Sequence, residues 1–254
     1  MVKLKLVRLL SRASAEAYHD LPNLKGYTAY PLAEGSAHAT LFVGKEDTIL
    51  AFRGTELDSM GDLVTDALFR REGIAGIPGK WHRGFKYQLM PLYYLALPRL
   101  RAHAPDGKPL YITGRSLGGA LATMFTAKAI SVNEEIMVNW KETVTFGAPR
   151  AANGKAARWF DSLIGDHVTR VEIVQDIVPH LPFAFLGYRH YGEALRVDAV
   201  KSQILKPRKW WTRLSLTVAL VRGARAHNAV SYVSSFYDFI ASAIRRVGAN
   251  EKSG

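Results

Sequence analysis

The fold is decided by one stretch, Leu110-Tyr111-Ile112-Thr113-Gly114-Arg115-Ser116-Leu117-Gly118-Gly119. Its first four residues are apolar and partly β-branched, which is typical of a short buried strand, and residues 117–130 predict a helix. The junction carries G-x-S-x-G, the pattern of a nucleophile elbow, in which a serine sits on a sharp strand-to-helix turn. Glycines flank the serine because the turn has no space for a Cβ there. The alternative is a glycine-rich turn with an inert serine.

The chain around this junction alternates strands with helices. Besides 110–113, strands are expected at 39–43, 48–52, 143–146 and 168–174. Besides 117–130 and an amphipathic N-terminal helix, helices are expected at 62–69, 85–103, 153–163 and 227–245. Strands that look buried and alternate with helices predict one α/β domain over residues 1–254, with a doubly wound, mostly parallel sheet and helices on both faces.

A nucleophilic serine needs a general base and a carboxylate that orients it, and in this type of fold they follow in the order serine, acid, histidine. His227 is the last histidine and precedes the closing helix, so we expect it to be the base; the alternative is a solvated loop histidine. Asp176 directly follows the strand at 168–174, at the sheet edge that also holds Ser116, and is the expected acid. Asp198 ends another expected strand and is the alternative acid.

The oxyanion that develops when a nucleophilic serine attacks a carbonyl group needs two hydrogen-bond donors beside the serine. The backbone N–H of Leu117, immediately after the nucleophile, is the first expected donor. The second is expected from Thr55, which follows the strand at 48–52 and offers both an N–H and a hydroxyl. The alternative for this segment is an ordinary turn at the end of a strand.

Together these segments resemble the class 3 lipase family of α/β-hydrolases, which includes the fungal triacylglycerol lipases. The shared motifs occur in the family's order: FRGT at 52–55, DLVTD at 62–66, HRGF at 82–85, GRSLGGALA at 114–122, TFGAPRAAN at 145–153, VQDIVPHLP at 174–182, YRHYGE at 188–193, and the terminal histidine. The resemblance implies an α/β-hydrolase fold and a serine carboxylester hydrolase (a lipase or esterase) that cleaves lipid acyl esters. It implies the same five site residues as the patterns above: Ser116, Asp176, His227, Thr55 and Leu117. The alternative enzyme is a phospholipase A1 acting on anionic membrane lipids.

The chain departs from the family's pattern in two ways. The family usually has histidine before the nucleophile, whereas this chain has Arg115. That residue is not the base, so we expect the chemistry to survive, with the cation either pairing with a nearby acid or favouring anionic acyl substrates. The secreted fungal members also carry disulfides, which this cysteine-free chain cannot form.

A short lid is expected at residues 56–70, where the family places an amphipathic helix over the site. Apolar residues recur there at helical spacing and alternate with an acidic face: Leu57, Met60, Leu63 or Val64, Ala67 and Leu68 form the stripe. The alternative is a surface helix that stays packed.

Composition limits the remaining functions. The 254 residues carry a formal charge of +12 and no cysteine, with a pI near 9.9 and a mean hydropathy of −0.04. The lack of cysteine excludes disulfide frameworks, zinc–cysteine sites, iron–sulfur clusters and cysteine nucleophiles. We expect no cofactor and no metal, because H-E-x-x-H, P-loop and dinucleotide motifs are all missing.

The basic excess gathers in residues 199–237, which hold seven lysines or arginines and no acid. Within them, Lys206–Arg213 pairs cations with two adjacent tryptophans, so we expect peripheral contact with an anionic lipid surface. The alternative is a solvated basic surface with the tryptophans packed inward. A nucleic-acid-binding module would rest on charge alone and is not expected, and a catalytically silent lipid-binding relative is disfavoured by the complete triad.

The N-terminal residues lack the uninterrupted apolar region of a secretory signal, and no run of about 18 apolar residues predicts a transmembrane helix. We therefore expect the cytoplasm by default, with export by a signal-independent route, or as a processed chain, as the alternatives. The sequence leaves the oligomeric state open.

Overall fold

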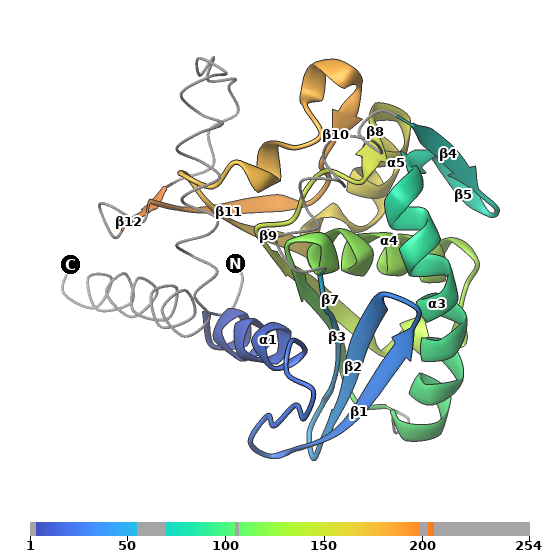
Figure 1. Cartoon of the computed structure of the whole chain (residues 1–254), viewed down its shortest axis with the longest axis vertical. Helices are drawn as coiled ribbons and strands as arrows, with labels where there is room; N and C mark the ends of the chain where they lie inside the picture. Colours follow the sequence, from blue (N-terminus) through green and yellow to red (C-terminus); the bar gives the residue numbers. More distant parts are fainter. Residues whose placement is uncertain (1–3, 55–69, 105–106, 199–202, 206–254) are drawn as a thin grey trace.

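The computed structural model describes residues 4–54, 70–104, 107–198 and 203–205 (Figure 1). Within these residues the main feature is an eight-stranded sheet with the spatial order β1-β2-β3-β6-β7-β9-β11-β12. The strands are β1 (Tyr27–Glu34), β2 (Ala37–Gly44), β3 (Thr48–Phe52), β6 (Leu110–Arg115), β7 (Trp140–Phe146), β9 (Val168–Ile173), β11 (Glu193–Asp198) and β12 (Gln203–Leu205).

The middle of this sheet is parallel. β3, β6, β7, β9 and β11 run in one direction, while β1 pairs antiparallel with β2, β2 with β3, and β12 with β11. Phe52 at the end of β3 is in register with Gly114 at the end of β6. The loops that follow β3, β6, β7 and β9 therefore all leave from the same edge of the sheet, where ligands of open α/β sheets bind.

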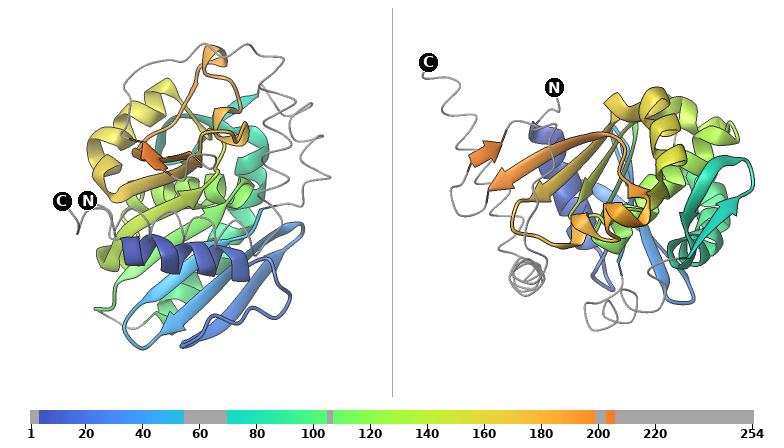
Figure 2. Two further views of the ribbon diagram at one scale, coloured as in Figure 1. Left: turned by 90° about the vertical axis from the view of Figure 1, so that its left-hand side faces the viewer. Right: turned by 90° about the horizontal axis from the view of Figure 1, so that it is seen from above.

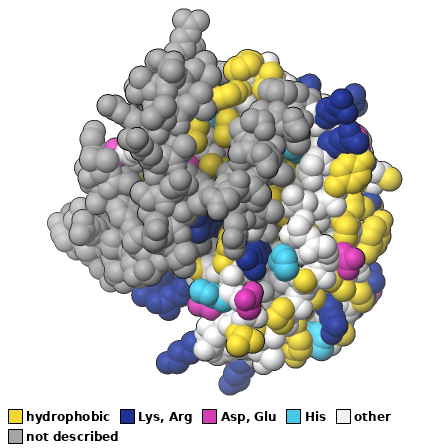
Figure 3. All heavy atoms as spheres, viewed as in Figure 1, with side chains coloured by type: hydrophobic (Ala, Val, Ile, Leu, Met, Phe, Trp, Pro, Cys, Tyr) yellow, Lys and Arg dark blue, Asp and Glu magenta, His cyan; other side chains and the backbone are white. Residues whose placement is uncertain are grey.

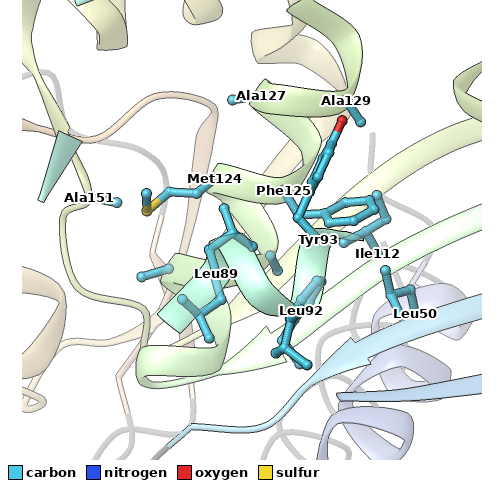
Figure 4. Packing of buried hydrophobic residues seen from close by; sticks show 14 of the residues in the cluster. Leu50, Leu89, Leu92, Tyr93, Ile112, Met124, Phe125, Ala127, Ala129 and Ala151 are labelled. Carbon is cyan, nitrogen blue, oxygen red and sulfur yellow. The ribbon is translucent and has the colours of Figure 1, made fainter. Parts of the chain in front are cut away.

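Three long helices connect the parallel strands on one face of the sheet: α3 (Arg83–His103), α4 (Leu117–Ser131) and α5 (Gly154–Ile164). The parallel strands β3, β6, β7 and β9 follow one another in the sheet in the same order as in the chain, and connections between parallel strands are right-handed. The connecting helices therefore lie on the same face of the sheet. Figure 4 shows Leu89 and Leu92 of α3 in one buried cluster with Phe125 of α4 and with Leu50 and Ile112 of the sheet. His82 caps the N-terminus of α3, because its Nδ1 accepts a hydrogen bond from the Phe85 N–H at 3.3 Å, so the HRGF motif has a capping role.

α1 (Leu4–Glu16) covers the opposite face, as the right-hand view of Figure 2 shows. Its apolar stripe of Val7, Leu10 and Ala13 is fully buried against sheet residues that include Ile49 and Phe146. Burying one such leucine side chain stabilises the fold by about 1.5–3 kcal/mol. The helix therefore holds the turn that follows it close to the ends of β3 and β6.

A second, smaller sheet adjoins α5 and consists, among the described residues, of β4 (Arg71–Ile74), β5 (Ile77–His82), β8 (Ala152–Asn153) and β10 (Tyr188–Arg189). Trp81 of β5 packs edge-on against Phe160 of α5, with ring centroids 5.6 Å apart. Short 3₁₀ turns complete the connections: η2 (Glu135–Asn139), η3 (Gly165–His167), η4 (Val178–His180) and η5 (Ala184–Leu186).

The expected α/β class and each expected strand and helix within the described residues are confirmed, with end points that agree to within three residues. β1, β4, β5, β8, β10 and β12 were not expected. The helices at 62–69 and 227–245 and nearly all of the lid at 56–70 lie outside the described residues. No helix in the part of the chain that the structure covers is long and apolar enough to cross a membrane.

Candidate active site

Ser116 occupies the strained turn between β6 and α4. Its backbone has φ 52° and ψ −128°, a region that side-chain-bearing residues adopt at a cost of the order of 1–3 kcal/mol. Gly114 and Gly118 make the turn sterically feasible, because a Cβ on Gly114 would overlap the Gly118 carbonyl and one on Gly118 would overlap the Phe52 carbonyl. The expected strand–serine–helix geometry of a nucleophile elbow is therefore present.

The elbow is fixed by backbone hydrogen bonds. The Ser116 N–H donates to the Phe146 carbonyl at the end of β7 at 2.9 Å, and the Ser116 carbonyl accepts from Gly119 at 3.0 Å. Leu117 is the first residue of α4, so its N–H belongs to the helix end that lacks intrahelical partners and carries partial positive charge. Ser116 is 4% exposed, so a negative charge that develops beside it interacts with these donors in an environment largely shielded from water.

Asp176 lies three residues beyond β9, at the same edge of the sheet as Ser116. Its backbone N–H donates to the Ile173 carbonyl at 3.0 Å, and its Oδ1 accepts from the Val178 N–H at 2.9 Å. These two bonds hold the carboxylate in a tight turn in which it is only 3% exposed. A carboxylate fixed this way is suited to orient an imidazole.

Asp198, the alternative acid, ends β11, which lies beyond β9 in the sheet and is thus one strand farther from β6. Its Oδ1 accepts a hydrogen bond from Gln175 Nε2 at 2.9 Å. The strand order therefore places Asp176 nearer than Asp198 to the strand that carries Ser116.

Charged side chains of β9 and β11, together with His190, form an ionic cluster next to the loop that carries Asp176. Glu172 of β9 pairs with Arg170 and, at 3.4 Å, with Arg196 of β11. His190 Nε2 lies 2.7 Å from the Pro179 carbonyl and 4.0 Å from Glu172. Burial, and after it the charges of Arg170 and Arg150, lower the pKa of His190 well below its usual value.

Arg150 is hydrogen-bonded to the backbone of residues 180–182, which follow Asp176 in the same loop. Its guanidinium donates to the carbonyls of His180 and, at 3.1 Å, Pro182, while its backbone N–H donates to Leu181 at 2.6 Å. Burial lowers the pKa of Arg150 to about 10 and also lowers the pKa of His180. No sequence pattern predicted a role for Arg150, although it lies within the motif at 145–153.

The cation before the nucleophile contacts an aromatic ring. The Cζ atom of Arg115 lies over Tyr18 at 5.6 Å from the ring centroid, and the residue is 7% exposed. Arg53, one residue after β3, reaches the same ring at 5.7 Å. The expected effect of Arg115 on substrate preference stays a prediction.

Three of the five expected site residues are thus placed at or near one sheet edge, namely Ser116, Leu117 and Asp176. Thr55 and His227 lie outside the described residues, as does the basic segment Lys206–Arg213. On the described part of the face seen in Figure 3, lysines and arginines are scattered among acidic and apolar side chains. No group of three or more histidine or carboxylate side chains suited to a metal occurs within the described ranges.

The comparisons of this chain with known proteins agree with one another on a single family. The family described as Lipase (class 3) matches residues 49–186. Phospholipase A1-II 1 from Oryza sativa subsp. indica is 29% identical over 215 residues, which cover 76% of this chain and 52% of the rice protein. Triacylglycerol lipase OBL1 from Nicotiana tabacum is 27% identical over 207 residues, covering 74% of this chain and 33% of the tobacco protein. The chain thus spans about half the length of the phospholipase relative.

Solved structures show the same fold. Lipase II from Rhizopus niveus superposes with a TM-score of 0.65 at 22% identity, covering 76% of this chain and 80% of its own. A triacylglycerol lipase whose catalytic centre is formed by a serine protease triad superposes with a TM-score of 0.61 at 22% identity, covering 78% and 82%.

Proposed function

The chain belongs to the class 3 lipase family, and on that premise we propose that it is a serine carboxylester hydrolase that cleaves the acyl esters of lipids. One observation carries the proposal: Ser116 occupies a strained, glycine-flanked turn at the sheet edge that also holds the buried carboxylate of Asp176. Backbone strain of this kind is retained where function requires it. The names of the rice and tobacco relatives, a phospholipase A1 and a triacylglycerol lipase, support lipid esters as the substrate class.

In the proposed mechanism, the Ser116 hydroxyl oxygen attacks the ester carbonyl carbon while His227 takes its proton. Asp176 accepts a hydrogen bond from the other ring nitrogen of His227, which fixes the tautomer and stabilises the imidazolium. The N–H of Leu117 and the donors of Thr55 stabilise the tetrahedral oxyanion. The imidazolium then protonates the leaving alkoxide, and the acyl group remains on the serine oxygen.

The second half of the cycle repeats these roles with water. His227 removes a proton from a water molecule, whose oxygen attacks the acyl-enzyme carbonyl. Collapse of the second tetrahedral intermediate releases the carboxylic acid and returns the proton to Ser116. The partial positive charge at the start of α4 is built into the fold, so it stabilises both oxyanions without rearrangement.

Contact with the lipid surface forms a second part of the proposal. We propose that residues 56–70 act as a lid within a single domain and that Lys206–Arg213 docks on anionic lipid. Two tryptophans within a cluster of cations support this assignment, since tryptophan favours the membrane–water interface and each cation near an anionic surface contributes about 1 kcal/mol. Stronger binding to anionic than to neutral vesicles at low salt is expected in co-sedimentation, and equal binding to both would contradict it.

A phospholipase A1 is the second candidate, favoured by the formal charge of +12 and by the rice relatives of that name. Hydrolysis of phosphatidylglycerol and of trioleoylglycerol in matched mixed micelles separates the two activities. A higher kcat/KM for the phospholipid would assign the chain to the phospholipases, and the reverse result would assign it to the triacylglycerol lipases.

The central test is hydrolysis of p-nitrophenyl esters from C2 to C18 by the wild type and by Ser116→Ala. We expect the substitution to abolish turnover and labelling by a fluorophosphonate while leaving the melting temperature within about 2 °C, because the side chain loses a single atom. Ser162→Ala is the matched control, because this serine lies exposed on α5 away from the elbow. Substantial ester turnover by Ser116→Ala would overturn the assignment.

A further inference from the structure

Tyr18 lies in the turn that ends α1, far in sequence from the other residues of the candidate site. Its backbone N–H donates to the Ala15 carbonyl at 3.0 Å, and the next N–H, that of His19, donates to Glu16 at 3.0 Å. The buried stripe of α1 fixes the helix on the sheet. Tyr18 is therefore presented from a rigid part of the fold.

The Tyr18 hydroxyl bridges two backbone segments. It accepts a hydrogen bond from the Gly54 N–H at 3.0 Å and donates one to the Arg115 carbonyl at 3.3 Å. Gly54 immediately precedes Thr55, the proposed oxyanion donor, and Arg115 immediately precedes Ser116, the proposed nucleophile. A single oxygen atom thus connects the two segments whose relative position determines the oxyanion hole.

The hydrogen bonds of the Tyr18 hydroxyl lie just beyond the last residue pair of the β3–β6 ladder. The parallel ladder between β3 and β6 ends at the pair Phe52 and Gly114, so the residues beyond it are not held together by that ladder. The N–H of Arg53 does not bond to β6 but donates to the His38 carbonyl on the β2 side at 3.0 Å. The Tyr18 hydroxyl therefore supplies a cross-link just past the last pair of the ladder.

Packing around Gly54 leaves little tolerance for movement. A Cβ on Gly54 would lie 2.7 Å from the Tyr18 hydroxyl oxygen, and 3.2 Å from both the Arg115 carbonyl oxygen and the Gly118 nitrogen. The end of β3 is therefore in direct contact with both the hydroxyl and the first turn of α4. A shift of the hydroxyl would shift the strand end relative to the elbow.

Two cations hold the ring itself. The guanidinium carbons of Arg53 and Arg115 lie 5.7 and 5.6 Å from its centroid, within the range of cation–π attraction. Each cation comes from one of the two bridged segments, so the ring and the hydroxyl connect the same pair of backbones. This gives Arg115 a structural role in place of the histidine that the family usually has there.

We propose that Tyr18 is a positioning residue, whose hydroxyl holds the backbone at Gly54, the residue before Thr55 in the sequence, at the distance from the Ser116 elbow that the oxyanion hole requires. The inference rests on the proposed ester hydrolase function. Tyr18 acts through Gly54 and touches no reacting atom. Its loss should therefore lower the stabilisation of the transition state more than the binding of the substrate.

The test compares Tyr18→Phe, which removes only the hydroxyl, with the wild type and with Tyr27→Phe. Tyr27 is a matched control because its hydroxyl also makes a side-chain hydrogen bond, to Asp47 at 2.6 Å, at the start of β1. On p-nitrophenyl butyrate, normalised by active-site titration, we expect kcat of Tyr18→Phe to fall about 10- to 100-fold with KM within about twofold. This is less than the loss of about 100- to 1,000-fold that follows removal of an oxyanion donor itself.

Two further measurements separate positioning from a general loss of structure. Affinity for a trifluoromethyl ketone, which forms a tetrahedral oxyanion on the serine, should fall in proportion to kcat/KM in Tyr18→Phe and stay unchanged in Tyr27→Phe. Hydrogen exchange at the Gly54 amide should accelerate in Tyr18→Phe alone.

The outcomes are distinguishable. If Tyr18→Phe keeps wild-type kcat, or if kcat and ketone affinity change no more than in Tyr27→Phe, the positioning role is wrong while the ester hydrolase function stands. If the wild type shows no turnover that depends on Ser116, both the proposed function and this inference are overturned.

Discussion

Replacing Gly118 with alanine would place a methyl group between the first turn of α4 and the end of β3. The new Cβ would overlap the Phe52 carbonyl oxygen and lie 2.8 Å from the carbonyl carbons of Phe52 and Arg53. Ordinary carbon–carbon contacts are about 3.5–4.0 Å, so the two segments must separate by roughly 0.7 Å or more. All the clashing atoms belong to the backbone and cannot move aside by rotating a side chain.

The expected consequences follow from that displacement. Overpacking of this kind costs about 1–3 kcal/mol, which for a chain of this size lowers the melting temperature by about 2–12 °C. The displaced backbone leads directly into Thr55, and a misplacement of about 1 Å in an active site costs about 100-fold in rate. We therefore expect kcat/KM for p-nitrophenyl butyrate to fall by about 100-fold at a temperature where the variant remains folded.

The assay measures kcat/KM and thermal unfolding of Gly118→Ala beside Gly73→Ala. Gly73 is an exposed glycine of β4 with an ordinary φ and no atom within 4 Å of an added Cβ, so this control should change neither quantity. Full activity of a folded Gly118→Ala would refute the reasoning, because the strand end would then tolerate displacement without loss of catalysis.

Two further predictions concern the carboxylates and the buried histidines. Asp176→Asn should lower kcat about 10⁴-fold, as expected when the base loses its orienting carboxylate, whereas Asp198→Asn should change it less than tenfold; equal losses in steady-state assays would contradict the assignment. Burial lowers the pKa of His190 below the 6.5 of an unfolded histidine, so the unfolded chain binds more protons as the pH falls and the folded state is destabilised below about pH 6.5. His190→Gln should flatten the decline in unfolding free energy between pH 7 and pH 5, measured by urea titration; an unchanged slope would show that other groups cause it.

Local patterns along the chain predicted much of the sheet. The segments of β3, β6 and β7 are apolar and bounded by turn residues, and α4 follows β6 directly. The hydrophobic pattern and the turn residues were therefore sufficient to predict these elements. The hairpin of β4 and β5 was missed because residues 71–82 mix glycine, charged and apolar residues without a clear alternation. β5 packs against α5 and β4 contacts α3, and no local sequence pattern reports such tertiary contacts.

The sequence by itself determined the family, the strained turn at Ser116 and the sheet edge at which Asp176 follows its strand, because these depend on residues adjacent in the chain and on the direction of parallel strands. Only the tertiary structure decided that β11 lies outside β9, and hence that Asp198 is one strand farther from Ser116 than Asp176. It also revealed that Tyr18 contacts Gly54 and Arg115 across 36 and 97 residues. Such contacts depend on strand order and on the packing of α1 against the sheet, which periodicity within one segment cannot encode.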